Sequence, residues 1–397
     1  MRTQRDIVVA TRIHLPEASA ASFRLDAVEK ALLGAGVPVR VLTTTAAGKT
    51  MRDAPGLRVL RWPVLRDKTG YVRGYIPYMS FDIPLFFRLL FSARPAAVLV
   101  EPPPTTGFMV RLAATIRRFP YVWYAADVWS DATQIAGAHP AVVKAVRAME
   151  KFAVAGAAHT IAVSEGVGAR VRSLGARRVS VVVNGIDTNT FTVDGGQLSA
   201  AERTEHNISD TYFLYAGTAS EWQGAEVFAH AIALVRKKYP KAQVAYLGNG
   251  SSWSQIGDIA ADISSGDASV PPVVQLPQVS AAVAARWQRG AVCSLVSICP
   301  GLGYDFAYPT KVLAALACGT PVIYAGTGPV AGDVMNNQLG YHVDYAVSEV
   351  AGAMEKMLNN EDDFPPSRLR KWVLENRSLA QTGRMAAKVV LKVARGS

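Results

Sequence analysis

The residue best suited to chemistry is a lysine, Lys311, which lies just inside the predicted start of a helix. Pro309 suits the first turn of that helix, because proline lacks an N–H that would be unpaired there anyway. A loop with two glycines, Pro300-Gly301-Leu302-Gly303, precedes the helix and follows a predicted apolar strand at 292–298. A strand, a glycine loop and a helix start with a nearby cation are typical of phosphate binding in α/β proteins. In the alternative interpretation, the glycines only form a turn and Lys311 binds nothing.

The elements around this lysine alternate between strand and helix. The chain begins with a predicted strand over 6–11, a helix over 23–33 and a second strand over 37–43. A polar, weakly patterned stretch at 195–210 interrupts the alternation, which starts again with a strand over 212–216. The sequence therefore predicts two doubly wound α/β halves, which bind ligands at the carboxyl ends of their strands.

Positive charge is concentrated in the first half. Residues 1–195 hold 25 Lys and Arg against 14 Asp and Glu, whereas residues 196–397 hold 17 of each. Within residues 49–94, nine basic and three acidic residues are interleaved with Trp, Tyr and Phe. Such a segment indicates an anionic membrane surface or nucleic acid. Because no nucleic-acid-binding motif accompanies it, we favour the membrane surface and expect no nucleic acid. A solvated basic face is the plain alternative.

Composition excludes several classes of protein. No apolar run approaches about 20 uncharged residues, so no membrane-spanning helix is expected, and the N-terminus lacks the pattern of a signal peptide. The three cysteines, Cys293, Cys299 and Cys318, lack metal-ligand spacing and are read as buried thiols in a reducing cytoplasm. The six histidines show no metal-binding arrangement either.

Five segments, in this order and spacing, carry a resemblance to a known family: HLPEASAASFRLDAVEKALLGAGVPVRVLT, AVSEGVGARVRSLGARRVSVVVNGIDTNTF, FLYAGTASEWQG, AYLGNG and YPTKVLAALACGTPVIYAG. The chain resembles the glycosyltransferases of the GT-B architecture and is most similar to family 4. It looks nearest to the branch with Pro-Glu in the first loop, an Asp-Leu-Trp-like turn (here Asp127-Val128-Trp129) and a Pro-Ser/Thr-Lys helix start. Members of that branch typically build cell-surface polysaccharides on lipid carriers.

The resemblance implies two Rossmann-like domains that face each other across a cleft. Residues 1–195 would form the acceptor side and residues 196–375 the nucleotide-sugar side, while a C-terminal helix at about 376–397 would cross back to the first domain. The sugar would be transferred with retention of anomeric configuration and without a metal. Backbone N–H groups, a helix N-terminus and a cation would then stabilise the leaving diphosphate.

The resemblance also implies roles for particular residues. The donor-binding candidates are Gly217, Gly248, Asn249, Gly301, Gly303, Asp305, Pro309, Thr310 and Lys311. The acceptor-binding candidates are Glu17, Ala18 and Ser19, although an exposed loop acid is the plain alternative for Glu17. Asp127, which follows a predicted strand, is the catalytic or acceptor-orienting candidate, because a carboxylate there could accept a proton from the acceptor hydroxyl. It could equally cap the following turn.

The chain departs from the family pattern at the donor site. Many members carry two glutamates separated by seven residues, of which the first contacts the sugar and the second the nucleotide ribose. Phe306 and Ala314 occupy those positions here, and Asp305 could substitute for the first glutamate. A basic pair that is common in the first loop of the second domain is also absent, with Gln223 where lysine is frequent. Because this basic pair is absent, more of the stabilisation of the donor diphosphate would depend on Lys311.

The predicted function is a cytoplasmic glycosyltransferase, peripheral at the inner face of the membrane, that uses a nucleotide sugar and a lipid-linked or glycan acceptor. A sugar-nucleotide epimerase with the same fold is a second hypothesis, and the missing glutamates argue against it. A degenerate, non-catalytic partner of another transferase is the third. Donor base, sugar and acceptor depend on the shape of the pocket, which the sequence does not specify.

Overall fold

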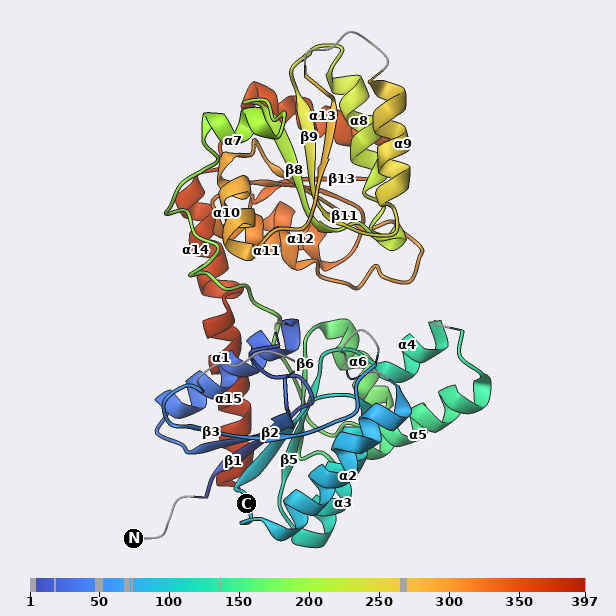
Figure 1. Cartoon of the computed structure of the whole chain (residues 1–397), viewed down its shortest axis with the longest axis vertical. Helices are drawn as coiled ribbons and strands as arrows, with labels where there is room; N and C mark the ends of the chain where they lie inside the picture. Colours follow the sequence, from blue (N-terminus) through green and yellow to red (C-terminus); the bar gives the residue numbers. More distant parts are fainter. Residues whose placement is uncertain are drawn as a thin grey trace. The chain divides into compact units, whose positions relative to one another are not determined.

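The structure is a computed structural model that describes residues 5–17, 19–46, 53–67, 72, 74–135, 137–264 and 270–396. The chain folds into two compact units (Figure 1). Unit 1 comprises residues 1–184 and 379–397, and unit 2 comprises residues 185–378. Each unit contains one parallel sheet flanked by helices. The predicted α/β class with two doubly wound sheets is therefore confirmed.

The sheet of unit 1 has seven strands in the order β3-β2-β1-β4-β5-β6-β7. β1 pairs in parallel with both β2 and β4, so the strand order reverses between β1 and β4. Val8 and Val9 of β1 belong to two different hydrophobic cores, because successive side chains of a strand point to opposite faces. The strands are β1 (Ile7–Ala10), β2 (Val39–Thr44), β3 (Leu57–Trp62), β4 (Ala97–Val100), β5 (Tyr121–Ala125), β6 (His159–Ala162) and β7 (Val179–Val181).

Helices cover both faces of this sheet. They are α1 (Ala20–Gly34), α2 (Tyr75–Phe91), α3 (Pro104–Arg117), α4 (Trp129–Ile135), α5 (Pro140–Gly156), α6 (Glu165–Ser173) and α15 (Leu379–Arg395). The C-terminal helix α15 belongs to unit 1, as the resemblance implied, and it packs along α1 (Figure 1). Gly383 permits their close approach, because a Cβ there would lie 2.3 Å from the carbonyl oxygen of Ala27.

The sheet of unit 2 has six strands in the order β10-β9-β8-β11-β12-β13, so its order reverses between β8 and β11. The strands are β8 (Tyr212–Thr218), β9 (Gln243–Asn249), β10 (Val273–Leu276), β11 (Ser294–Ser297), β12 (Val322–Ala325) and β13 (Gly340–Val343). The helices are α7 (Ala200–Glu205), α8 (Glu226–Val235), α9 (Trp253–Ile263), α10 (Ala281–Gly290), α11 (Thr310–Ala317), α12 (Pro329–Asn336), α13 (Val347–Asn359) and α14 (Pro366–Asn376), with a 3₁₀ turn at Glu221–Gln223.

Two details differ from the sequence prediction. The predicted linker at 195–210 contains α7, whose first turn is fixed by hydrogen bonds between Ser199 and Glu202. The division between the units falls at residue 184, before the linker, because Ile186 donates a backbone hydrogen bond to Arg377, 2.8 Å away.

The basic aromatic segment at 49–94 also contains a helix that the sequence analysis did not predict. Residues 49–52, 68–71 and 73 lie outside the described part of the chain, and the remainder includes β3 and α2. The sequence of α2 is apolar and aromatic along most of its length and carries an internal proline, Pro84, so its pattern did not indicate a helix.

Candidate functional site

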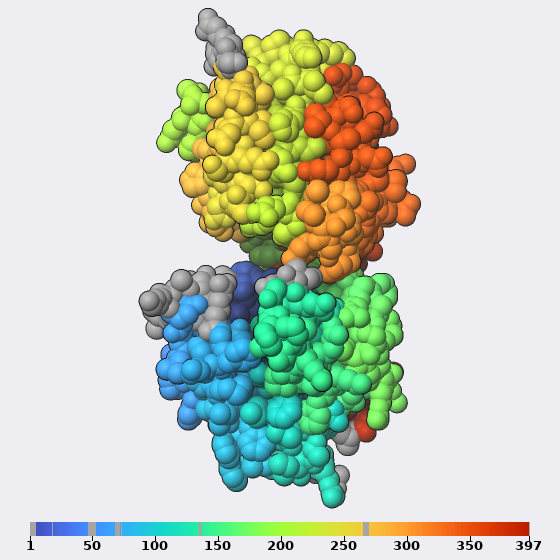
Figure 2. Space-filling view, turned by 90° about the vertical axis from the view of Figure 1, so that its right-hand side faces the viewer, coloured from blue at the N-terminus to red at the C-terminus, as the bar shows by residue number. Residues whose placement is uncertain are grey.

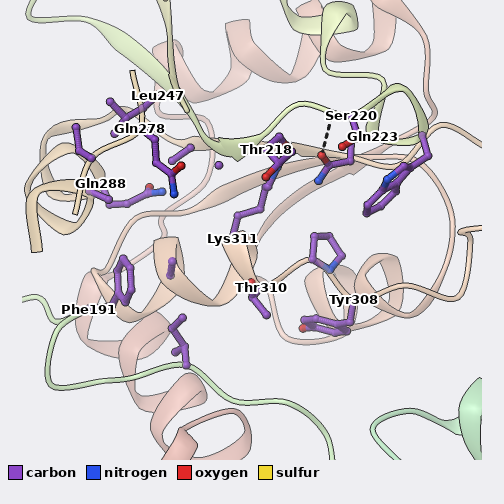
Figure 3. Close-up of a pocket in the computed structure, with 18 residues that line it drawn as sticks. Phe191, Thr218, Ser220, Gln223, Leu247, Gln278, Gln288, Tyr308, Thr310 and Lys311 are labelled. Carbon is purple, nitrogen blue, oxygen red and sulfur yellow. Dashed lines mark hydrogen bonds between the residues drawn. The ribbon is translucent and has the colours of Figure 1, made fainter. Parts of the chain in front are cut away.

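A cavity of about 640 Å³ lies at the carboxyl ends of the strands in unit 2 (Figure 3). Its walls come from the ends of β8 and β9, the residues after β10, and the helices α10 and α11. It therefore lies at the β8–β11 reversal of strand order, where open α/β sheets bind their ligands. The lining residues are Ile186, Phe191, Ala216, Gly217, Thr218, Ser220, Trp222, Gln223, Leu247, Gln278, Val279, Ala284, Gln288, Tyr308, Pro309, Thr310, Lys311 and Ala314.

Lys311 occupies the centre of this cavity. Figure 3 shows its side chain rising from α11 toward Thr218. Its Nζ donates hydrogen bonds to the Tyr215 hydroxyl, 2.7 Å away, and to the Thr218 carbonyl oxygen, 2.9 Å away. It also lies 3.9 Å from the centre of the Tyr215 ring. These contacts hold the ammonium group against the end of β8.

The charge of Lys311 has no carboxylate partner in the described part of the chain. Burial lowers the pKa of its ammonium group to about 7. A cation that is held by neutral oxygens and an aromatic ring can still gain a strong interaction with an anion. The site is therefore suited to a phosphate or diphosphate group.

Backbone at the start of α11 and the end of β8 adds to this preference. α11 begins at Thr310 with Pro309 as its N-cap and no side-chain capping bond, and its first residues line the cavity, so the positive end of the helix dipole borders it. Gly217 has φ +124°, which disfavours any other residue. A Cβ on Gly248 would lie 2.1 Å from the Gly217 carbonyl oxygen. These two glycines bring the strand ends close together beside Lys311.

The glycine loop before α11 does not line the cavity. Gly301 and Gly303 each have φ +80° and are exposed. Asp305 accepts hydrogen bonds from the Thr327 hydroxyl, 2.8 Å away, and from the Gly301 amide, 3.4 Å away. The Thr327 bond lowers the pKa of Asp305. Asp305 thus fastens this loop to the segment after β12, and its predicted sugar contact, like the predicted role of the two glycines, stays a prediction.

Polar side chains lie on both sides of Lys311 in the cavity. Figure 3 shows Gln278 and Gln288 on one side of Lys311, and Ser220 and Gln223 on the other. Gln223 is held by the Ser220 amide, which donates to its Oε1 over 3.0 Å. Asn249, a predicted donor residue outside the lining, donates to Gln278 Oε1 over 3.4 Å. Sequence reasoning missed Gln278 and Gln288, because nothing in the local sequence pattern distinguishes these two glutamines.

The predicted catalytic residue lies in unit 1. Asp127 follows β5, and its pKa is raised, first by desolvation and then by the like charge of Glu101, against the opposing effect of Arg24. Arg24 and Glu101 form a buried ion pair with 2.5 Å between Nη2 and Oε1. Sequence reasoning did not single out this pair, although Glu101 follows β4 as Asp127 follows β5. The carboxyl edge of the sheet in unit 1 thus carries a coupled group of charges.

The predicted acceptor residues on the first loop are engaged with their own unit. Glu17 forms an ion pair with Arg66, with 2.6 Å between Oε1 and Nη1. Ser19 is the N-cap of α1, and its Oγ accepts from the Ser22 amide over 3.1 Å. Ala18 lies outside the described residues. The acceptor roles of all three stay predictions.

The described residues contain no cluster of three or more His, Cys, Asp or Glu side chains that could hold a metal ion. Nor does the described part of the chain contain a helix long and apolar enough to cross a membrane.

The two units have the fold of the GT-B class, and sequence comparison gives the family. Residues 21–186 match the Glycosyl transferase 4-like domain, and residues 210–360 match Glycosyl transferases group 1. The chain therefore belongs to the family 4-like glycosyltransferases, as the resemblance indicated.

A curated relative agrees with this assignment, and two solved structures share the fold. The D-inositol 3-phosphate glycosyltransferase of Pseudarthrobacter chlorophenolicus is 29% identical over 190 residues, which cover 46% of this chain and 42% of the relative. The match thus spans less than half the length of that relative. Anabaena HepE in complex with UDP and glucose has a TM-score of 0.66 at 14% identity, covering 97% of this chain and 99% of HepE. A Rickettsia africae glycosyltransferase has a TM-score of 0.70 at 12% identity, covering all of both chains. At such identities the two structures show the fold alone.

Proposed function

We propose that this protein is a retaining, metal-independent glycosyltransferase that transfers a sugar from a nucleotide-sugar donor to a lipid-linked or glycan acceptor at a membrane surface. The product would belong to a cell-surface polysaccharide or glycoconjugate, built at the inner face of the membrane. The observation that carries the proposal is the cavity in unit 2, in which Lys311 faces the ends of β8 and β9. HepE, with the same fold, binds UDP and glucose.

The cavity favours transfer over the alternative of epimerisation. An epimerase would need an acidic or basic pair at the sugar to move protons. None of the lining residues is acidic, and Lys311 is the only basic one among them. Stabilisation of a leaving diphosphate requires no carboxylate, because a cation and backbone N–H groups can supply it.

The test is a panel of UDP-, GDP- and dTDP-sugars, with release of the nucleoside diphosphate and thermal unfolding as readouts. We expect at least one donor to raise the unfolding temperature, since a ligand at 100 times its Kd stabilises the folded state by about 2.7 kcal/mol. The same donor should release its nucleoside diphosphate as the sugar passes to an acceptor or to water, and the product should keep the anomeric configuration of the donor sugar. Binding without release would favour the non-catalytic partner, and absence of binding to the whole panel would refute the proposed function.

The membrane part of the proposal has structural support on α2. Its outer face carries four exposed apolar residues with helical spacing: Ile76, Ile83, Phe87 and Phe91. Phe91 is 79% exposed and stacks with Phe87, with 6.3 Å between the ring centres. Figure 2 shows α2 in light blue on the surface of unit 1. An apolar stripe on a helix within a basic unit is suited to the boundary of an anionic bilayer.

We expect the protein to bind vesicles with phosphatidylglycerol at low salt and to leave them at high salt, since screening weakens the attraction of its basic residues. The substitutions F87S and F91S together should weaken binding at least tenfold, because complete burial of one Phe ring is worth about 1.5–3 kcal/mol. Co-sedimentation measures the bound fraction.

The matched control removes two exposed apolar side chains from unit 2, Met335 (55% exposed) and Leu374 (41% exposed). The substitutions M335S and L374S together should leave vesicle binding unchanged. Binding that is independent of salt, or equal losses for both double variants, would contradict the role of α2.

A further inference from the structure

The outer face of the C-terminal helix α15 carries a row of positive charge. Its exposed side chains include four basic ones at positions i, i+4, i+8 and i+11: Arg384, Lys388, Lys392 and Arg395. The helix has no acidic residue, and none of the four forms an ion pair with a described residue. The helix dipole attracts cations only to the last turn, so it accounts for Lys392 and Arg395 but not for the other two. Because residues four apart on a helix are neighbours, these like charges repel one another.

A groove between α1 and α15 lies beside this row. It encloses about 470 Å³ and is lined by all four basic side chains, with small and apolar residues between them: Ala31, Ala35, Ala387 and Leu391. No acidic residue belongs to the described lining. Asp26, an acid on α1, is already paired with Lys30, 2.7 Å away. The groove therefore gathers positive charge that the described residues do not neutralise.

A second hollow, of about 370 Å³, lies at the last turn of α15 and shares Lys392 with the groove. Its other basic residues are His159, the first residue of β6, and Arg178, which directly precedes β7. His159 Nε2 pairs with the Ser180 hydroxyl over 2.9 Å. The pKa of His159 is lowered, first by burial and then by the positive charges of Lys392 and Arg178. Two cations and a histidine from three separate segments thus converge on one hollow, and no acid is among its described lining residues.

This basic surface is distinct from the apolar stripe on α2. Leu85 of α2 and Val390 of α15 belong to different cores, on opposite faces of the sheet in unit 1 (Figure 1). A bilayer that covers the outer face of α2 therefore leaves the outer face of α15 in water. Met385, which is 40% exposed, is the only large apolar side chain exposed on α15, all of whose residues are described. The face thus has little to insert between lipids, and its chemistry fits a soluble anion.

We propose that the groove and the hollow together bind a soluble anion with two or more phosphate groups, in a site separate from the donor cavity of unit 2. Lys392, Arg178 and His159 hold one phosphate group, and the other cations of α15 hold the next. Neighbouring cations on the helix lie about 5–6 Å apart at Cβ, so they can bind successive phosphate groups of one ligand. Charged N–H donors form strong hydrogen bonds with phosphate oxygens. The site does not depend on the proposed transfer reaction, because it lies entirely in unit 1.

The test titrates inorganic tripolyphosphate into the full chain at low salt and measures the Kd by calorimetry. K311A serves as the parent protein, because the donor cavity could itself bind a phosphate compound. We expect one tripolyphosphate to bind per chain, and high salt to weaken the binding through screening. R178Q and K392Q together should raise the Kd by about tenfold or more, because two charge-assisted contacts are lost. R384Q and K388Q together, in the groove, should have a similar effect. Thermal unfolding shows whether each variant is folded.

The matched control removes two exposed lysines of α5 in the same unit, Lys144 and Lys151, which line neither the groove nor the hollow. K144Q and K151Q together should keep the Kd within about twofold of the parent value, since distant exposed charges are screened. Equal losses in the control and in the site variants, or absence of tripolyphosphate binding, would overturn the assignment.

A second arm replaces tripolyphosphate by vesicles that contain phosphatidic acid, which separates a lipid headgroup from a soluble ligand. The R178Q and K392Q protein and the α5 control lose the same charge, so we expect them to bind these vesicles equally. Vesicle binding that is lost only in the R178Q and K392Q protein would identify a lipid headgroup as the ligand and overturn the soluble source.

Discussion

Replacement of Lys311 by alanine is expected to lower kcat/KM for the nucleotide-sugar donor by about 100- to 1,000-fold, or roughly 3–4 kcal/mol of transition-state stabilisation. Among the described residues, Lys311 is the only basic one that lines the cavity. Negative charge on the diphosphate grows as the sugar–phosphate bond breaks, so the ammonium group should interact more strongly with the transition state than with the bound donor. The loss should therefore affect kcat as well as KM, which steady-state kinetics would separate.

The fold should tolerate this change. The Tyr215 hydroxyl donates to the Thr218 carbonyl oxygen over 2.8 Å, so both groups keep a partner without Lys311. Thermal unfolding of K311A should then occur at the native temperature or above it, since a half-buried cation without a carboxylate partner is removed. Lys237, an exposed lysine just after α8 in the same unit, provides the control, and K237A should keep native kinetics. Native turnover in folded K311A would disprove the phosphate assignment.

Donor affinity is expected to fall as pH rises above 7. The pKa of Lys311 in the free protein is lowered to about 7, because burial disfavours its charged form. A diphosphate beside Nζ favours the charged form, so binding must raise this pKa. At pH values between the pKa of Lys311 in the free protein and its pKa in the complex, the protein takes up a proton on binding. In this range the affinity decreases by at most about tenfold per pH unit. Below pH 7 the lysine is already protonated and its contribution becomes constant.

Isothermal titration of a nucleoside diphosphate at pH 7–9, in two buffers with different ionisation enthalpies, measures this proton uptake directly. The terminal phosphate of the ligand titrates at about pH 6, so its own titration contributes little to the proton uptake measured at pH 7–9. K311A should bind weakly with no such pH dependence. A pH-independent affinity in the native protein would show that Lys311 stays charged without ligand or does not contact the phosphates.

Local patterns were sufficient for the architecture of the chain. Alternating strand and helix signals predicted two doubly wound units, because the period of apolar residues and the turn chemistry of Gly and Pro are local properties. The helix α11 illustrates this, since it begins beside Pro309 and ends before Gly319, which has φ +77°. The apolar, proline-containing sequence of α2 has no such clear period, so its helix and exposed stripe were found only in the structure.

The sequence predicted only some of the residues that line the cavity. Gly217, Pro309, Thr310 and Lys311 were predicted at the donor site and line one cavity, because they follow strands or begin a helix at the same edge of the sheet. Gly301 and Gly303, predicted on the same reasoning, lie outside the lining.

The sequence by itself determined the class of fold, the family and the lysine at the start of α11. Only the tertiary structure decided that Lys311 meets Tyr215 and Thr218, which are more than 90 residues away. The physical reason is that sheet order and helix packing choose which distant segments meet. Burial then determines what their polar groups can do, as the lowered pKa of Lys311 shows.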